Sequence, residues 1–481
     1  MVKEVANSKE NESSLLGRFF HLLSAFSVEA VLGPIFYLGL AWHNAALYGD
    51  VMYAVMASAV VTISVQFGLY APLVRELSDP ERDKREVLLR YSYLRIGIMT
   101  ITVICTAIAV QWLGLSKHLA WMTIIIAIGR GCKELAFTFF ADLRVRGQQK
   151  LEGRIVMVSV FSAFTYAFAA LALGLSPEAL SAYMFIWGLV LTTLAFKQIK
   201  KTYGSLFEAP VQTNLLKPTL AAGVIFALVA LLRLAYHHTT VLFLERASGS
   251  KAVGYYCASL GIVDVTILIV SGLYLEAVFF PEINKLWDKD REKTTLAFRK
   301  NASWLLAITI PIAYFIFVKS ETIIRLVYPP NYTSSIYVLK CMALTIPTLC
   351  LASVFYNFLI VSKQEKTLLF LGTTAFLVNF GLNWTLVRTH GIYGAALVPV
   401  FTALFLVLQY LVICQLRHRL FAFTDLLVPL LSISAIMGLH KLLSLVLPIH
   451  VDIIVGLILY GLTLLIYRLR YVGRPAAQMA V

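Results

Sequence analysis

Long apolar runs recur along this whole sequence, and they constrain its fold more than any other feature. Each run is about 20 residues long, the length that a helix needs to cross the hydrocarbon core of a bilayer. Short turns with charged side chains separate the runs. The sequence therefore predicts an all-α, multi-pass membrane protein with fourteen transmembrane helices, which begin near Phe19, Tyr48, Tyr93, Leu119, Arg154, Pro177, Pro218, Val253, Ala302, Ser335, Thr367, Ile392, Asp425 and Val451.

The composition argues against a soluble enzyme. Of the 481 residues, 59% are hydrophobic and only 14% are charged, which is typical of polytopic membrane proteins. No connection between the expected spans is much longer than about twenty residues, so a catalytic or nucleotide-binding domain outside the membrane has no room. The six cysteines lie in apolar runs without metal-ligand spacing, and we expect no metal site.

The distribution of basic residues predicts the orientation in the membrane. The formal net charge is +15, which in a soluble protein would suggest nucleic acid as a partner. Of the 41 Lys and Arg residues, however, 30 fall on the side of the N-terminus and six on the opposite side. Because positive residues collect in cytoplasmic loops, we expect both termini in the cytoplasm and no nucleic-acid partner.

Two stretches of the sequence resemble each other. Tyr48-Gly49 opens one span and Val253-Gly254 another, and the charged segments after Pro72 and Pro281 match in sign at a shift of 209 residues. This similarity predicts an internal repeat in which the first and second spans correspond to the seventh and eighth. Parallel repeats of this kind enclose a central substrate path in transporters. The alternative is a chance similarity that arises from shared membrane-protein composition.

The repeat and a long polar connection, residues 197–217, divide the chain into three parts. We expect two pseudo-symmetric six-helix lobes, residues 1–205 and 206–418, around a central cleft. Residues 419–481 then form two further C-terminal helices, which have no counterpart in the repeat, and a cytoplasmic tail.

Ionisable side chains inside the expected spans are candidate functional groups, because intramembrane charges are costly and commonly serve transport. Arg233 lies near the middle of the seventh span, with His237 and His238 one turn beyond. Glu29 lies at the matching depth of the first span, and Asp264 lies in the eighth. These groups either handle substrate or protons in a cleft or form ion pairs that hold the bundle. Glu29 and Asp264 are rival partners for Arg233.

The fourth span carries three charged residues within five positions. Arg130 and Glu134 are four residues apart and can pair on one helix face. Lys133 would then have no partner on its own helix and would line a cavity. No catalytic residue is expected, and the candidate substrate-binding residues are Arg233, Arg130, Lys133, Glu29, Asp264, His237 and His238.

Several short segments, in one order along the chain, carry a family resemblance. They are Leu47-Tyr48-Gly49-Asp50, Gln66-Phe67-Gly68-Leu69, Val253-Gly254-Tyr255-Tyr256, Phe280-Pro281-Glu282-Ile283, Tyr328-Pro329-Pro330-Asn331-Tyr332, Asn379-Phe380-Gly381-Leu382-Asn383 and His390-Gly391-Ile392-Tyr393-Gly394. With these segments the chain resembles bacterial polysaccharide-lipid flippases of the Wzx type. That group lies within the multidrug/oligosaccharidyl-lipid/polysaccharide exporter superfamily, which also includes lipid II flippases and drug antiporters.

The resemblance implies two six-helix lobes around a V-shaped cleft and an alternating-access mechanism. The implied cargo is a polyprenyl-pyrophosphate-linked oligosaccharide, carried across the bacterial inner membrane for O-antigen or exopolysaccharide synthesis. It also implies a monomeric transporter without a cofactor, with H+ or Na+ as candidate coupling ion and a polysaccharide polymerase or other assembly protein as candidate partner. Many members carry an aspartate late in the seventh span, where this chain has His237-His238-Thr239-Thr240. A coupling scheme borrowed from the family is therefore in doubt.

Two rival functions remain beside the flippase. A cation-coupled multidrug antiporter of the same superfamily would use Glu29 as its coupling carboxylate, but cationic drugs favour an acidic cavity, and Arg130, Lys133 and Arg233 argue against one. A membrane glycosyltransferase or polymerase would need catalytic groups on a substantial outer loop, and the sequence has none.

Overall fold

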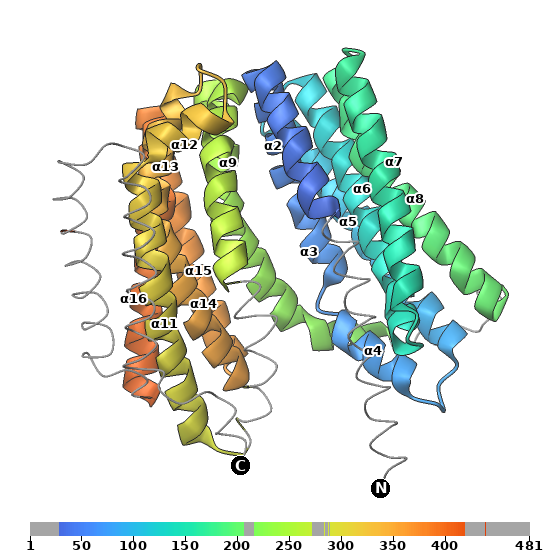
Figure 1. Ribbon diagram of the computed structural model, residues 1–481. Coiled ribbons are helices and arrows are strands. Elements are labelled where there is room, and N and C mark those ends of the chain that lie inside the picture. The colour runs from blue at the N-terminus through green and yellow to red at the C-terminus, as the bar shows by residue number, and fades with distance from the viewer. Residues whose placement is uncertain are drawn as a thin grey trace, which may run out of the picture. The chain divides into compact units, whose positions relative to one another are not determined.

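The computed structural model describes residues 28–205, 216–271 and 289–418, together with Ile283, Trp287 and Gly438. Every regular element in these residues is a helix (Figure 1), so the all-α prediction is confirmed. By their internal contacts the residues group into two compact units, Met1–Tyr255 and Tyr256–Val481. Each unit is described by itself.

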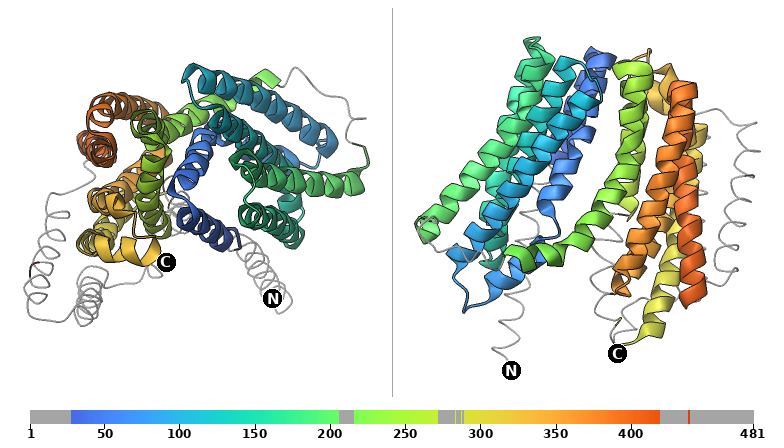
Figure 2. Two further views of the ribbon diagram at one scale, coloured as in Figure 1. Left: turned by 90° about the horizontal axis from the view of Figure 1, so that it is seen from above. Right: turned by 180° about the vertical axis from the view of Figure 1, so that it is seen from behind.

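The N-terminal unit is a bundle of long helices (Figures 1 and 2). Within it, α6 contacts α2, α3, α4, α5, α7 and α8, so it is the central helix of the bundle. The elements are a helical segment Val28–His43, then α2 (Ala45–Ala57), α3 (Ala59–Gln66), α4 (Tyr70–Ser78), α5 (Lys84–Trp112), α6 (Lys117–Val145), α7 (Gln149–Ala172), α8 (Pro177–Tyr203) and the larger part of α9 (Leu216–Ile267).

The C-terminal unit contains the end of α9 and a second set of helices. Its buried aromatic side chains pack edge to face: the ring centroids of Phe298 and Phe358 are 5.3 Å apart, and those of Trp287 and Phe358 are 5.8 Å apart. The elements are α11 (Arg291–Val318), α12 (Ser320–Val327), α13 (Thr333–Ala343), α14 (Thr345–Val361), α15 (Glu365–Leu382), the π-helical turn η4 (Asn383–Val387) and α16 (Arg388–His418).

Glycines in unusual backbone conformations separate neighbouring spans. Gly249 interrupts α9 with a φ of 76°, and Gly391 interrupts α16 with a φ of 55°, a region that glycine enters without steric cost. Helix is present at each of the first twelve expected spans. Seven helices in the described ranges are long and apolar enough to cross a membrane, or eight if α13 and α14 form one bent span. The two spans expected near Asp425 and Val451 lie outside the described residues.

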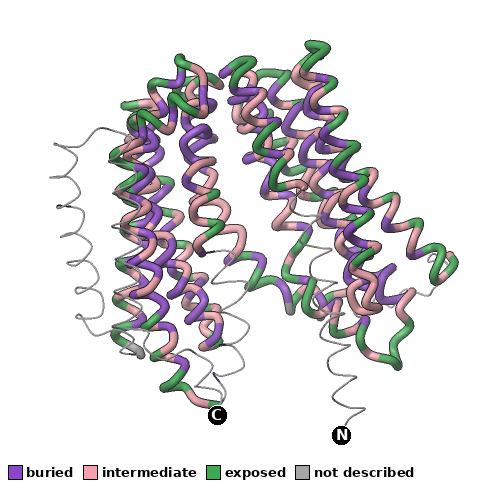
Figure 3. Tube along the Cα trace, in the orientation of Figure 1, coloured by how far each residue is buried: buried purple, intermediate pink, exposed green. Residues whose placement is uncertain are grey.

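The exposed surface of the helices is apolar, as lipid contact requires. Ile101 is 65% exposed and Ile108 is 61% exposed, although both lie within α5. Figure 3 shows buried and exposed residues alternating along the helices of each unit. A soluble protein rarely exposes such extended apolar surface, so the burial pattern agrees with the multi-pass membrane assignment.

The second expected span contains a break before Ala71-Pro72. Residues Ala45–Ser78 together are long and apolar enough for one span, but α3 ends at Gln66, where Phe67 and Gly68 both have positive φ and turn the chain into the separate helix α4. The reason is tertiary, because Glu76 on α4 accepts from Tyr91 Oη at 2.9 Å and pairs with Arg90 on α5. The corresponding Phe280-Pro281 lies outside the described residues, so the repeat remains a prediction.

Candidate functional site

Two glycines let α6 and α8 approach each other backbone to backbone. A Cβ atom on Gly188 would lie 2.0 Å from the carbonyl oxygen of Gly129, and one on Gly129 would lie 2.4 Å from that of Met184. Small residues permit this kind of close helix crossing in membrane proteins. The crossing brings the charged turn of α6 against Trp187 of α8.

Lys133 is held at this crossing by two partners. Its Nζ lies 3.1 Å from Glu29 Oε1 and 3.7 Å from the ring centroid of Trp187. The side chains of Lys133 and Glu29 are 21% and 33% exposed, so the ion pair is partly buried. A cation over an aromatic face adds attraction of about 0.5–2 kcal/mol, more as water is excluded.

Arg130, one turn before Lys133, is a cation without a direct counter-charge. Its Nη1 donates to the neutral hydroxyl of Thr62 at 3.2 Å, and its buried Nε has no hydrogen-bond partner. Among the described residues it makes no ion pair, although Glu29 and Glu134 are close enough to interact with it electrostatically. A cation without an ion pair is costly inside an apolar bundle, so Arg130 stays a candidate for binding an anion.

The pairing that the spacing within α6 allows is not formed. Arg130 and Glu134, four residues apart, could pair on one helix face, which would leave Lys133 without a partner on its own helix. Instead Glu134 lies against Gln66, and Arg95 Nη1 donates to the Glu134 carbonyl oxygen at 2.6 Å. The cause is that α3 packs beside α6 and offers Thr62 and Gln66 to the two side chains. Lys133 pairs instead with the carboxylate of Glu29, which belongs to the first expected span.

Aromatic side chains hold the wall of this site in place. Tyr37 Oη and Tyr183 Oη are 3.0 Å apart and hydrogen-bonded, and both lie close enough to Arg130 to interact with it. Behind them, Phe164 contacts Tyr183 and Trp187 with ring centroids 6.0 Å away in each case. The phenol oxygens and the indole face therefore present polar, oriented groups toward two cations.

Helix α9 brings one histidine to the same region. His238 is close enough to Arg130 for electrostatic interaction, and its buried Nδ1 has no hydrogen-bond partner. The His237 ring lies beside it at a centroid distance of 5.0 Å. Arg233, five residues earlier on α9, has an exposed side chain.

The structure thus brings together four of the seven sequence-predicted residues, namely Glu29, Arg130, Lys133 and His238, in the N-terminal unit. Asp264 belongs to the C-terminal unit. Its relation to Arg233 is left as a prediction.

Sequence reasoning missed Thr62, Tyr37, Tyr183 and Trp187. Hydroxyl and aromatic residues are common in membrane helices, so they carry no individual signal. The one available clue was Gly188, directly after Trp187, because a glycine inside an apolar helix often marks a close helix contact. That clue would have placed Trp187 at an interface.

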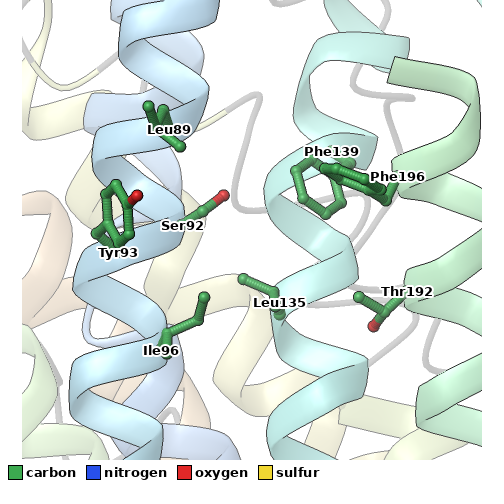
Figure 4. Close-up of a pocket in the computed structure, with 8 residues that line it drawn as sticks. All are labelled: Leu89, Ser92, Tyr93, Ile96, Leu135, Phe139, Thr192 and Phe196. Carbon is green, nitrogen blue, oxygen red and sulfur yellow. The ribbon is translucent and has the colours of Figure 1, made fainter. Parts of the chain in front are cut away.

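A separate apolar cavity of about 150 Å³ lies between α5, α6 and α8 (Figure 4). It contains none of the predicted site residues and no charged side chain. Three lining residues carry a hydroxyl group, namely Ser92, Tyr93 and Thr192, and Thr192 already donates to the carbonyl of Cys132 at 2.5 Å. A phosphate or a sugar would find too few polar partners here. The lining residues are Leu89, Ser92, Tyr93, Ile96, Leu135, Phe139, Thr192 and Phe196.

Solved structures with this fold are membrane transporters. Lipid II flippase MurJ in an inward closed conformation superposes with a TM-score of 0.64 at 16% identity, covering 94% of this chain and 99% of the other. An inward-facing multidrug resistance MATE family transporter of the MOP superfamily gives 0.62 at 13% identity, covering 84% and 94%. A MOP superfamily transporter from Pyrococcus furiosus gives 0.54 at 14% identity, covering 88% and 96%.

At these identities the structural likeness establishes the fold. A search of curated protein sequences finds no significant match. The sequence does match a family model, described as polysaccharide biosynthesis protein, over residues 44–337. That match covers more than half of the chain and includes every residue of the site except Glu29 and Tyr37. The resemblance stated from the sequence is therefore confirmed, and the chain belongs to the polysaccharide biosynthesis protein family.

Proposed function

We propose that this protein is a flippase that moves a polyprenyl-pyrophosphate-linked oligosaccharide from the cytoplasmic to the outer leaflet by alternating access. The observation that carries the proposal is Arg130, a half-buried residue whose Nη1 donates to the neutral Thr62, whose buried Nε has no hydrogen-bond partner, and which has no ion pair in the described part of the chain. A guanidinium matches a phosphate group with two parallel hydrogen bonds. The family match supports polysaccharide biosynthesis as the context.

The site can bind an anion without covalent chemistry. Arg130 and Lys133 supply two positive charges, and the ion pair between Lys133 and Glu29 offsets one of them. The anionic pyrophosphate would bind to the remaining positive charge, while the sugar contacts hydroxyl and aromatic groups such as Tyr37 and Tyr183. The polyprenyl tail would remain in lipid, where apolar chains are most stable. Two six-helix lobes, residues 1–205 and 206–418, would alternate around this path.

A multidrug antiporter is the second candidate, because MATE family transporters share the fold. In that case Glu29 would bind the coupling ion. Its carboxylate is instead paired with Lys133 at 3.1 Å, and the excess of cations disfavours a cationic drug. The Pyrococcus furiosus transporter is described as having a binding pocket of reverse polarity that suggests a different function, so the fold accommodates more than one pocket charge.

Removal of the Arg130 charge tests the flippase proposal. Arg130→Gln should lower glycan export by roughly 10- to 100-fold, since a hydrogen bond to a charged group contributes about 1.5–3 kcal/mol, and Arg130→Lys should retain part of the activity. Arg233→Ala, on the exposed side of α9, is a companion variant that should lose export without losing protein from the membrane.

Export is measured as surface glycan in a strain that lacks the wild-type gene, with membrane protein levels measured in parallel. The matched control is Arg325→Gln, since Arg325 pairs with Glu321 at an exposed position. Wild-type export by Arg130→Gln would refute a role for this cation in cargo binding.

Orientation in the bacterial inner membrane is a further proposal, with both termini in the cytoplasm. It is supported by the bias of 30 against six basic residues between the two sides. A reporter fused at Lys289 should report the cytoplasmic side. A periplasmic signal at that position would contradict both the orientation and the parallel repeat.

A further inference from the structure

A second polar cluster lies near the start of α2. Here α2 meets the segment of α9 around Gly249 so closely that a Cβ atom on Gly49 would lie 1.7 Å from the Ser250 carbonyl oxygen and 2.9 Å from the Gly254 amide nitrogen. The contact is backbone to backbone. The side chains next to these glycines therefore lie close together.

Two carboxyl groups meet at this contact. Asp50, directly after Gly49, is only 8% exposed. Glu245, one turn before Gly249, accepts a hydrogen bond from Ser250 Oγ at 3.0 Å. The Ser250 side chain also lies against Asp50, and the two carboxyl groups are close enough to interact electrostatically. Ser250 therefore stands between them.

Each carboxyl group has an oxygen atom that nothing satisfies. Asp50 Oδ1 and Glu245 Oε2 are both buried and have no hydrogen-bond partner. A hydroxyl has a single proton, so Ser250 can donate to one carboxyl only, and it donates to Glu245. Ser250 can still accept a hydrogen bond from Asp50, but only if Asp50 carries a proton.

The surrounding charges do not balance two carboxylates. His118, at the start of α6, has its Nε2 3.8 Å from Asp50 Oδ2, which is too long for a hydrogen bond. The same nitrogen is 3.3 Å from Ser116 Oγ. From α9 itself, Arg246 donates to the carbonyl of Leu113 and Lys251 lies over the Tyr255 ring. From α2, Tyr53 is a neutral neighbour of Glu245.

We propose that Asp50 and Glu245, bridged by Ser250, share one bound proton and form a proton-binding site at the junction of α2, α6 and α9. Two like charges that interact at a contact where each has a buried oxygen cannot both stay ionised at low cost. One proton removes the repulsion and supplies the missing donor. Loss of the proton would favour separation of α2 from the segment of α9 around Gly249. The site shares no residue with the Arg130 cluster, and its proton binding does not depend on the identity of the cargo.

Infrared spectroscopy of the purified full chain in lipid nanodiscs tests the site directly, because a protonated carboxyl group has its own C=O stretching band. At neutral pH the wild type should show this band at one protonated carboxyl group per protein molecule. Asp50→Asn and Glu245→Gln should each lack the band, since removal of either carboxyl group lets the other ionise. Glu321→Gln, an exposed carboxyl in the C-terminal unit, should keep the wild-type band. Asp50→Glu and Glu245→Asp retain both carboxyl groups and should keep it too.

Three results would overturn the proposal. If neither amide variant loses the band, the pair is fully ionised. If only one variant loses it, the proton belongs to a single buried carboxyl group. If the band appears only when sodium is replaced by an organic cation at constant pH, the occupant is Na+ instead of a proton. Circular dichroism and size-exclusion chromatography identify variants that fail to fold. If the amide variants do not fold, the wild type, Asp50→Glu and Glu245→Asp still distinguish a bound proton from a bound sodium ion.

Discussion

Lys133→Met is expected to lower the free energy of unfolding by about 3 kcal/mol, because it leaves the Glu29 carboxylate without its counter-charge. The value is taken from the lower end of the range for buried pairs, since both side chains keep some exposure. The loss of the contact with the Trp187 ring at 3.7 Å adds to the effect. Thermal unfolding in detergent measures it, and Arg325→Met should change stability by less than about 0.5 kcal/mol as an exposed control.

The double variant Lys133→Met with Glu29→Leu separates structure from transport. Removal of both members of an ion pair is often tolerated where removal of one is not, so stability should return toward that of the wild type. Export should stay low, because the anion still lacks one of its two cations. If export recovered together with stability, Lys133 would be a purely structural partner of Glu29, and Arg130 alone would remain as the proposed anion ligand.

Gly188→Ala is expected to destabilise the N-terminal unit by about 3 kcal/mol or more, the upper part of the range for overpacking. Its new methyl group would lie 2.0 Å from the Gly129 carbonyl oxygen, and a backbone atom cannot rotate out of the way. The helices α6 and α8 must then move apart, which draws Lys133 away from Trp187. We therefore expect low export even at temperatures where the variant is folded.

A matched glycine gives the control for this variant. Gly97 lies within α5, and a Cβ atom there would meet nothing within 4 Å. Gly97→Ala should be neutral or stabilising by up to about 1 kcal/mol, because alanine favours the helix. Thermal unfolding and export are measured for both variants. Equal stability of Gly188→Ala and the wild type would show that the close crossing of α6 and α8 does not support the site.

The sequence by itself determined the class of fold and the approximate position of the helices that the structure describes. Length and hydropathy are local properties, and a bilayer of about 30 Å imposes the same requirement on every span. The ionisable residues inside the spans could also be identified from the sequence. Glu29, Arg130 and Lys133 stand out because charges are rare in apolar runs. The family motifs at Gly49 and Gly254 were visible too, although their contact with each other was not.

Only the tertiary structure decided which of these groups meet. The helical spacing favoured a pair between Arg130 and Glu134, but α3 packs beside α6 and supplies Thr62 to Arg130, while Lys133 finds Glu29, 104 residues away in the chain. The partner of a charge inside a membrane depends on which helix lies beside it. That choice depends in turn on close contacts such as Gly129 with Gly188, whose geometry joins residues far apart in sequence and leaves no local pattern.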